Sequence, residues 1–295
     1  MKNRPGFDTF SHLKHRRRIE SLFKLLMLTS ATVVLLSLAL ILLTILWKSL
    51  PALKLSMITR TPGSGYYLGK EGGILNAILG SLQLVLGATL LALVIALPAV
   101  IFLNSYLRKK SLQAEAVRFT LDVLWGIPSI VYGAFGFLLM ITFQLRASLL
   151  AGMLTVALVE LPILSRALDE TMKLVPPELK EATYSLGASR WQTATRVVLR
   201  QTFPGLVTAV LMAIGRGLGD AAAVLFTAGY TDKITTSLLQ PVATLPLAIF
   251  FQLNSPFPAV QQRVYASAAI LTLLILIISL VSRSLSRRLS RHKIF

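Results

Sequence analysis

Six long apolar runs divide the chain, at residues 25–46, 74–104, 119–144, 148–168, 203–229 and 263–281. Each run has roughly the 20 residues that an α-helix needs to cross the hydrocarbon core of a bilayer. Because lipid offers no hydrogen-bond partners, such runs must satisfy their backbone groups within helices. The pattern therefore predicts an all-α polytopic membrane protein with six transmembrane helices and a transmembrane domain covering residues 25–282.

The segments between the runs are short and either basic or rich in turn-forming residues. Residues 1–24 form a basic arm, and residues 283–295 form a basic tail. Between the last two runs, residues 245–251 are apolar again. They are too few to span a bilayer, so we expect this stretch either to re-enter the membrane or to lie at its interface.

The lysines and arginines are distributed unevenly about the six runs. Of the 30 basic residues, 22 fall in segments on one side, seven fall on the other, and Arg216 lies inside the fifth run. Basic residues are enriched on the cytoplasmic side of membrane proteins. The count predicts a multi-pass membrane protein with both termini in the cytoplasm.

Composition narrows the classes of partner and ligand. The net charge is +18, but the basic residues flank apolar runs instead of forming one soluble basic domain. This arrangement favours anionic lipid headgroups over nucleic acid as partners. The chain has no cysteine, and His12, His15 and His292 are too scattered for a metal site. No phosphate-binding loop with the required spacing is present, so we expect neither a metal nor a cofactor on this chain.

A polar segment at residues 178–201 separates the fourth and fifth runs. Pro176 and Pro177 end the preceding run and suit the start of a new helix. Glu178 and Glu181 favour that start, because the N-terminal end of a helix carries partial positive charge. A polar helix between two apolar runs is expected at a membrane face, outside the hydrocarbon region.

Gly187 is predicted to end this helix, and residues 188–201 to form a second short helix. In the second helix, Trp191, Ala194 and Val198 recur on one side at intervals of three or four residues. Two short helices joined at a glycine predict a compact knob, residues 178–201, that fits a groove on a soluble partner. The alternative interpretation is an ordinary cytoplasmic loop with helical content.

Two charged residues lie deep in the fifth run. Arg216 and Asp220 are four positions apart, which places them on one face of a continuous helix. At that depth an ionisable side chain normally faces a bundle interior or an aqueous cavity. The pair either stabilises packing by neutralising itself or lines a path for a solute.

The fourth run also contains ionisable residues. Glu160 lies near its middle, before Pro162, and fits either a buried structural hydrogen bond or a transport role. Arg166 lies near the end of the run and fits either a solute contact or an ion pair with Asp169 or Glu170 at helical spacing.

Several of these segments resemble permeases of binding-protein-dependent, ATP-driven importers, and within them the phosphate permeases. Glu181-Ala182-Thr183, followed by Gly187, resembles their coupling-loop signature, and the likeness continues to residue 205. In that stretch, Arg200 stands where the family usually has a proline. The likeness covers most of residues 72–282.

The fifth run carries a second part of the resemblance. Its segment GRGLGD, residues 215–220, resembles the family pattern Gly-Arg-x-x-Gly-acid. The family usually has Glu where this chain has Asp220, and a proline where it has Ala223. The segment around Pro128 in the third run, WGIPSIVYG, is also very similar to the phosphate permeases.

The resemblance implies the fold of a type I importer permease that performs no covalent chemistry. Its partners would be a second, PstC-like permease, an ATPase dimer that binds the ATP, and an extracytoplasmic phosphate-binding protein. The residues expected to line the substrate path are Arg216, Asp220, Arg166 and Glu160. Those expected to couple to the ATPase are Glu181, Ala182, Gly187, Arg190 and Trp191.

Two other functions remain open from the sequence. In the first alternative, the chain would be a permease of the same superfamily that carries another oxyanion, such as molybdate or sulfate. A self-contained ion-coupled carrier would use Arg216 and Asp220 as a relay. The second is disfavoured because no internal repeat is recognisable.

Overall fold

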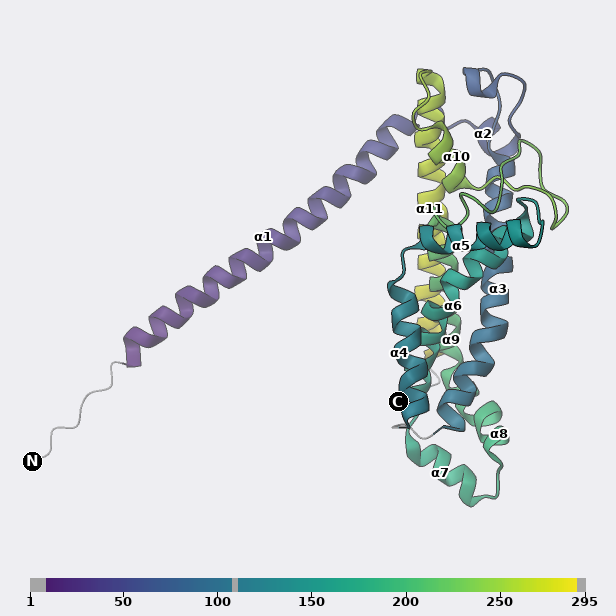
Figure 1. Ribbon diagram of the computed structural model, residues 1–295. Helices are drawn as coiled ribbons and strands as arrows, with labels where there is room; N and C mark the ends of the chain where they lie inside the picture. Colours follow the sequence, from purple (N-terminus) through teal and green to yellow (C-terminus); the bar gives the residue numbers. More distant parts are fainter. Residues whose placement is uncertain (1–8, 108–110, 291–295) are drawn as a thin grey trace, which may run out of the picture. The chain divides into compact units, whose positions relative to one another are not determined.

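A computed structural model describes residues 9–107 and 111–290 of the chain (Figure 1). The start of the basic arm, the basic residues 108–110 and the end of the basic tail lie outside the described residues. The chain forms two compact units, residues 1–48 and 49–295. In the described residues the structure is helical, with one isolated β-bridge between Pro62 and Gly72. The predicted all-α fold class is therefore confirmed.

Helix α1 (Thr9–Ser49) makes up almost all that is described of the first unit. Its segment Ile19–Ser49 is long and apolar enough to cross a membrane. The large apolar side chains along it, such as Leu35 and Leu43, are exposed. Such a surface is typical of a helix surrounded by lipid or by other subunits.

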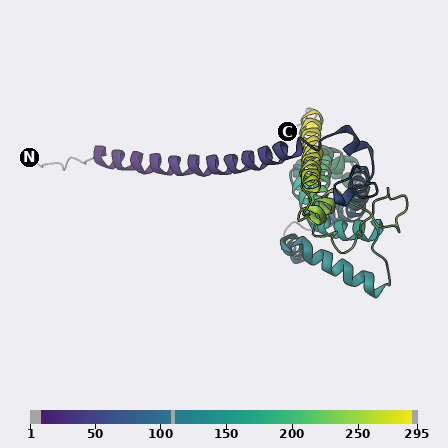
Figure 2. The same cartoon turned by 90° about the horizontal axis from the view of Figure 1, so that it is seen from above.

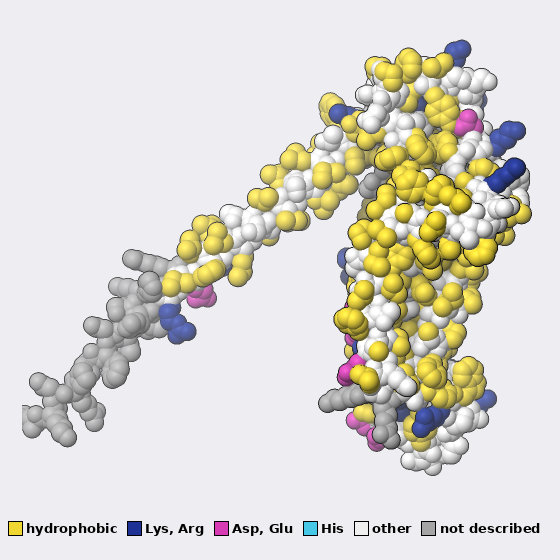
Figure 3. Space-filling view, viewed as in Figure 1, with side chains coloured by type: hydrophobic (Ala, Val, Ile, Leu, Met, Phe, Trp, Pro, Cys, Tyr) yellow, Lys and Arg dark blue, Asp and Glu magenta, His cyan; other side chains and the backbone are white. Residues whose placement is uncertain are grey.

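The long helices of the second unit are α3 (Leu75–Ser105), α6 (Leu149–Lys173), α9 (Leu199–Gly219) and α11 (Pro258–Ser290). They run along the same direction in Figure 1, and Figure 2 shows α11 nearly end-on. Apolar side chains cover the middle of this unit, and charged ones gather toward its ends (Figure 3). In the described residues, five helices can cross a membrane by length and composition, or six spans if a bent pair counts as one.

Small residues allow α3 and α6 to pack closely. Ala88, Ala92 and Ala96, spaced by four on one face of α3, are fully buried. A Cβ atom on Gly152 of α6 would lie 2.9 Å from the Leu84 side chain of α3. Helices in membranes associate through such small-residue contacts, because lipid supplies no hydrophobic force between them.

The third apolar run forms two helices, α4 (Leu112–Gly126) and α5 (Ser129–Thr142), at an angle of 96°. Pro128 stands at the break and lacks the amide proton that a continuing helix needs. The Tyr132 hydroxyl donates a hydrogen bond of 2.9 Å to the Leu124 carbonyl, which ties the two helices across the break. The predicted span 119–144 is therefore broken at Pro128, and α5 runs across the bundle (Figure 1).

The fifth apolar run differs from its predicted range in a similar way. Helix α9 ends at Gly219, whereas the predicted span continued to residue 229. Glycines at 215, 217 and 219 weaken the helix, and the Asp220 carboxylate then accepts a hydrogen bond of 3.0 Å from the Ala223 amide. Short polar side chains that bond locally to the backbone in this way compete with helix formation.

The non-helical residues 220–244 have backbone partners in neighbouring elements. The Leu149 and Leu150 amides at the start of α6 donate to the carbonyls of Gln240 and Leu238, each at 2.8 Å. Gly133 of α5 lies so close to this segment that a Cβ atom would be 2.7 Å from the Ala222 carbonyl oxygen. Irregular backbone at membrane depth is tolerated only where protein surrounds it in this manner.

The two ends of the second unit carry different elements (Figure 1). Helices α2 (Leu55–Thr59) and α10 (Leu245–Gln252) lie at one end, whereas α7 (Pro177–Ser185) and α8 (Arg190–Gln192) lie at the other. The apolar stretch 245–251 is thus a short helix, and its Leu245 and Leu247 are fully buried. It packs on α11 and α3.

A polar cluster holds the α2–α10 end together around the short helix η1 (Tyr66–Leu68). The Arg263 guanidinium of α11 donates to the Tyr66 and Gly69 carbonyls at 2.9 Å each, and lies 4.7 Å from the centre of the Tyr66 ring. The Tyr67 hydroxyl donates to Asp232. Burial raises the pKa of the Tyr66 phenol to about 12, so this hydroxyl is neutral at physiological pH.

At the α7–α8 end, the buried carboxylate of Asp169 joins three helices. It accepts hydrogen bonds from Arg118 of α4 at 2.9 Å and from Asn104 of α3 at 2.8 Å. Lys173 and Arg166 of its own helix lie 2.8 Å and 3.4 Å from the same carboxylate. Because this side chain is fully buried, its charge depends on these donors.

We predict that Asp169→Asn lowers the free energy of unfolding by about 3 kcal/mol, because it removes one partner of a buried ionic network. The measurement is thermal unfolding of the purified complex in detergent. Glu170→Gln is the matched control, since Glu170 is 59% exposed and its pairs with Arg166 and Lys173 are worth little. Equal losses in the two variants would contradict the role of Asp169.

Candidate functional site

Arg216 and Asp220 line one open groove of about 590 Å³. Arg216 belongs to the last turn of α9 and is exposed, whereas Asp220 is the first residue beyond the helix and is half-buried. The helical repeat on which the same-face prediction relied therefore ends before Asp220. The groove, formed where the helix stops, is what brings the two residues together.

The start of α5 contributes to the same groove. Ser129 is its first residue and lines the groove beside Arg216. The amide groups of the first turn of a helix lack partners within the helix and carry partial positive charge. A guanidinium and a helix N-terminus at one opening form an arrangement suited to an anion.

Glu160 lies behind this groove. It is 1% exposed and sits on α6 against α9, where a Cβ atom on Gly217 would collide with its carboxylate. Neither of its oxygens has a hydrogen-bond partner within hydrogen-bonding geometry among the described residues.

Arg166 lies in a different environment from Arg216. Its guanidinium is 2.7 Å from Asp122, 3.4 Å from Asp169 and 3.6 Å from Glu170. The ion pairs with Asp169 and Glu170 at helical spacing are therefore present. The structure brings together Arg216 and Asp220, with Glu160 behind them, and places Arg166 in the Asp169 network.

The knob begins with α7, which ends as its sequence predicts. Gly187 has φ of +80°, in the left-handed region that glycine adopts without strain. The Gly187 amide donates to the Tyr184 carbonyl at 2.9 Å, and the Ala188 amide to the Thr183 carbonyl at 3.1 Å. This pair of bonds is the Schellman motif, which satisfies the last carbonyls of a helix.

The second part of the knob differs from the short separate helix predicted at 188–201. Ser189 and Gln192 form a reciprocal capping box at the start of α8. From there a π-helical turn, η2 (Thr193–Val198), leads directly into α9. Arg190–Gly219 is thus one helical stretch of 30 residues. It connects the knob to the groove at Arg216.

The five residues expected to couple to an ATPase are all exposed on the knob: Glu181, Ala182, Gly187, Arg190 and Trp191. Leu186 is 86% exposed, and a hollow of about 280 Å³ lies between it and Arg196. Two bonds hold the knob to the end of α3, from Lys180 to the Asn104 carbonyl and from Arg190 to the Tyr106 carbonyl. Exposed apolar side chains on a polar protrusion indicate a protein contact.

Sequence reasoning missed two features of the site. Ser129 belongs to the segment WGIPSIVYG, which stood out only by its resemblance to the phosphate permeases, and nothing in that segment showed which groove α5 would face. Arg118 lies too far along the chain from Asp169 for sequence spacing to reveal their pairing. The helical spacing of Arg166 and Asp169 was the available signal for this network.

Comparisons with known proteins show the family to which the chain is related. Residues 102–293 match the family described as binding-protein-dependent transport system inner membrane component. The phosphate transport system permease protein PstA of Yersinia pestis is 37% identical over 212 residues, covering 72% of each chain. PstA of Haemophilus influenzae is 35% identical over 82% of this chain and 85% of its own. PstA 1 of Mycobacterium tuberculosis strain H37Rv is 36% identical over 72% and 68%.

Solved structures share the fold. A chain of the MetNI methionine ABC transporter, in an inward-facing conformation, aligns with a TM-score of 0.57 at 19% identity over 73% of this chain and 95% of its own. A chain of a bacterial alginate ABC transporter aligns with a TM-score of 0.56 at 15% identity over 95% and 99%. At these identities the likeness concerns the fold alone.

We predict that Glu160→Gln leaves the stability of the complex unchanged or raises it by about 1 kcal/mol, because a buried carboxylate without a hydrogen-bond partner is costly to keep charged. Thermal unfolding in detergent measures this difference. Asp169→Asn serves as the contrast, since that carboxylate has several donors. A loss above about 1 kcal/mol in Glu160→Gln would show that the carboxylate has a strong partner.

Proposed function

We propose that this chain, which belongs to the family of binding-protein-dependent transport system inner membrane components, forms half of the translocation path for inorganic phosphate. It is a multi-pass inner-membrane permease of an ABC importer, and ATP hydrolysis belongs to a separate subunit. Family membership implies an ATPase and a binding protein as partners. It also favours an ATP-driven importer over a self-contained carrier.

The observation that carries the proposal is the groove at the end of α9. Phosphate is an anion that still carries protons at neutral pH. Its path therefore needs a positively charged hydrogen-bond donor, and it can also use a hydrogen-bond acceptor for the phosphate hydroxyl. Arg216 supplies a charge-assisted donor, and the first turn of α5 at Ser129 adds backbone amides. Asp220 accepts a hydrogen bond from the hydroxyl group of phosphate, a donor that fully ionised sulfate lacks. The carboxylate repels sulfate, and this discriminates between the two anions.

The other two predicted path residues take different roles in this proposal. Glu160 is buried behind the groove against Gly217, so in this proposal it supports the packing of α6 on α9 and does not line the opening. Arg166 holds three carboxylates at the α7–α8 end, so it fixes α6 and does not contact the solute.

The open side of the groove indicates where partner subunits would bind in this proposal. Arg216 is exposed, so a second permease, PstC-like, would complete the channel opposite it. In this proposal both termini lie in the cytoplasm, and the knob therefore also lies on the cytoplasmic side. There an ATPase dimer contacts the exposed knob residues Glu181, Ala182, Gly187, Arg190 and Trp191. An extracytoplasmic phosphate-binding protein delivers the solute at the α2–α10 end.

We predict that Asp220→Asn lowers phosphate uptake about tenfold and weakens the exclusion of sulfate, because one charge-assisted hydrogen bond is worth about 1.5 kcal/mol or more. Arg216→Gln is expected to reduce uptake of every oxyanion. Radiolabelled uptake with sulfate as competitor measures both effects. Glu115→Gln, which neutralises an exposed carboxylate in the first turn of α4, is the control.

An unchanged phosphate rate together with unchanged sulfate exclusion in Asp220→Asn would remove the carboxylate from the selectivity argument. The nature of the solute is tested separately, on the complex purified with its native partners. Phosphate-loaded binding protein should stimulate its ATP hydrolysis. Stimulation by sulfate- or molybdate-loaded binding protein alone would identify another oxyanion as the substrate.

A further inference from the structure

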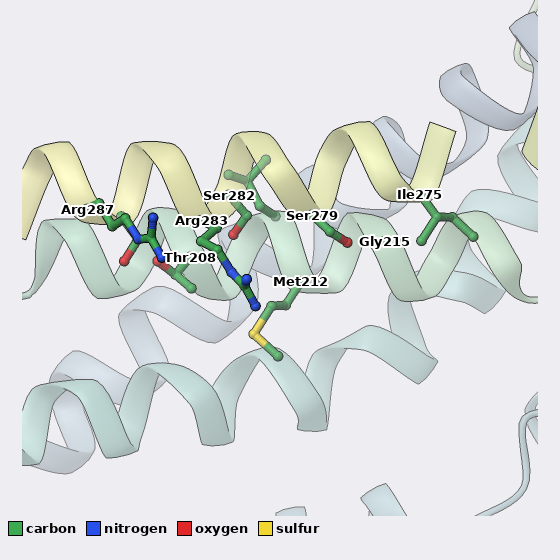
Figure 4. A pocket seen from close by; sticks show the side chains of 10 residues that line it. Thr208, Met212, Gly215, Ile275, Ser279, Ser282, Arg283 and Arg287 are labelled. Carbon is green, nitrogen blue, oxygen red and sulfur yellow. The ribbon is translucent and has the colours of Figure 1, made fainter. Parts of the chain in front are cut away.

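A second cavity, of about 520 Å³, lies between α9 and α11 (Figure 4). Helix α9 contributes Thr208, Met212 and Gly215 to its lining, whereas α11 contributes hydroxyl and guanidinium groups. In Figure 4 the Arg283 side chain extends from α11 toward Met212 of α9, with Ser279 and Ser282 beside it. None of the functional roles described above uses these side chains.

Near its C-terminal end, α11 presents a row of polar side chains to this cavity. Ser279, Ser282, Arg283 and Ser286 follow each other at helical spacing and line the cavity. Neighbouring positions on the same helix, such as Leu276 and Leu280, are apolar and exposed. A lipid-facing surface has no need of a strip of hydroxyl groups, so this face indicates contact with water or a polar solute.

This cavity adjoins the groove that contains Arg216 along α9. Gly215 lines both of them, one residue before Arg216. Thr208, also in the cavity, lies about 12 Å along α9 from Arg216 at 1.5 Å per residue. Between Thr208 and Gly215 the α9 wall is apolar, with Leu211 and Met212, so the polar lining of the cavity comes mainly from α11. Helix α11 ends toward the α7–α8 end of the unit (Figure 1).

The position of Arg283 fits the inner edge of the bilayer. Arg263 and Arg283 lie on the same helix, about 30 Å apart along its axis, which is the thickness of the hydrocarbon core. Arg263 is held at the α2–α10 end by Tyr66. Arg283 thus lies where an anion leaves the membrane, and Ser279 lies about one turn deeper.

We propose that this cavity is a second oxyanion site on the solute path, between Arg216 and the cytoplasm, with Arg283 as its principal donor. The inference rests on the proposed function. A single deep arginine would hold an anion tightly, whereas a second site of similar chemistry lets the anion leave in steps. The serine hydroxyls donate hydrogen bonds to the phosphate oxygens, and Asp220 has no counterpart here, so selection occurs at the groove before this site.

The cavity would bind the phosphate group of an anionic lipid through the same contacts as free phosphate. The first experiment therefore distinguishes a lipid headgroup from the transported solute. The complete complex is reconstituted in phosphatidylcholine vesicles, with and without phosphatidylglycerol, and phosphate uptake is measured. Arg283→Gln should lower uptake about fivefold in both types of vesicle. Arg288→Gln, which removes an exposed positive charge outside the cavity, should stay within about twofold of the wild type.

Each outcome decides the matter. Wild-type uptake in Arg283→Gln, or a defect seen only with phosphatidylglycerol, would overturn the second site, and the latter result would identify a lipid headgroup site. Absence of phosphate uptake by the wild-type complex, together with transport of another oxyanion, would refute the proposed function instead. The two failures are therefore distinguishable.

A second measurement does not depend on the folding of Arg283→Gln. Because the chain has no cysteine, single cysteines can be introduced directly. Ser279→Cys should react with a negatively charged methanethiosulfonate at least about tenfold faster than Leu280→Cys, and phosphate should slow that reaction. Equal reaction rates at the two positions would show that the cavity lies outside the aqueous path and overturn the inference.

Discussion

The buried carboxylate of Asp169 is the constraint on which the α7–α8 end of the bundle depends. It holds Arg118 of α4, Asn104 of α3 and Lys173 of α6 at one point. An unpaired charge at that depth would cost several kcal/mol, so the three helix ends must stay together to keep it satisfied. The knob is attached near the same point, because Lys180 and Arg190 donate hydrogen bonds to backbone carbonyls at the end of α3.

A continuous helix then connects this end to the proposed solute groove. The stretch Arg190–Gly219 begins in the knob beside Trp191 and ends about one turn after Arg216. In the proposed function, force on the knob would reach Arg216 along this helix, and the π-helical turn η2 near its start is a point where the helix can adjust. Glycines such as Gly217, which lies against Glu160, allow α9 to pack closely on its neighbours. Because of this close packing, a shift of α9 would also move the residues that contact it.

Much of this architecture was predictable from the sequence, for reasons that lie in local chemistry. Apolar runs predict helices because lipid leaves no alternative, and Gly187 ends α7 because few other residues adopt its backbone conformation. The end of α9 at Gly219 was not predicted, because hydropathy stays high to residue 229 and the backbone partners of residues 220–244 come from distant α6. The pairing of Arg118 with Asp169 and the meeting of Ser129 with Arg216 likewise depend on tertiary contacts between distant residues.

The central claim is that the knob is the cytoplasmic surface through which an ATPase acts on the groove. The most direct measurement uses single cysteines at Leu186, which is 86% exposed on the knob, and at Leu68, which is 63% exposed at the opposite end. With a membrane-impermeant thiol reagent, we expect Leu186→Cys to react only in inside-out vesicles and to be shielded when the ATPase subunits are bound. Leu68→Cys should react only from the outer face. Reaction of Leu186→Cys from outside the cell, or equal reaction with and without the ATPase, would contradict the claim.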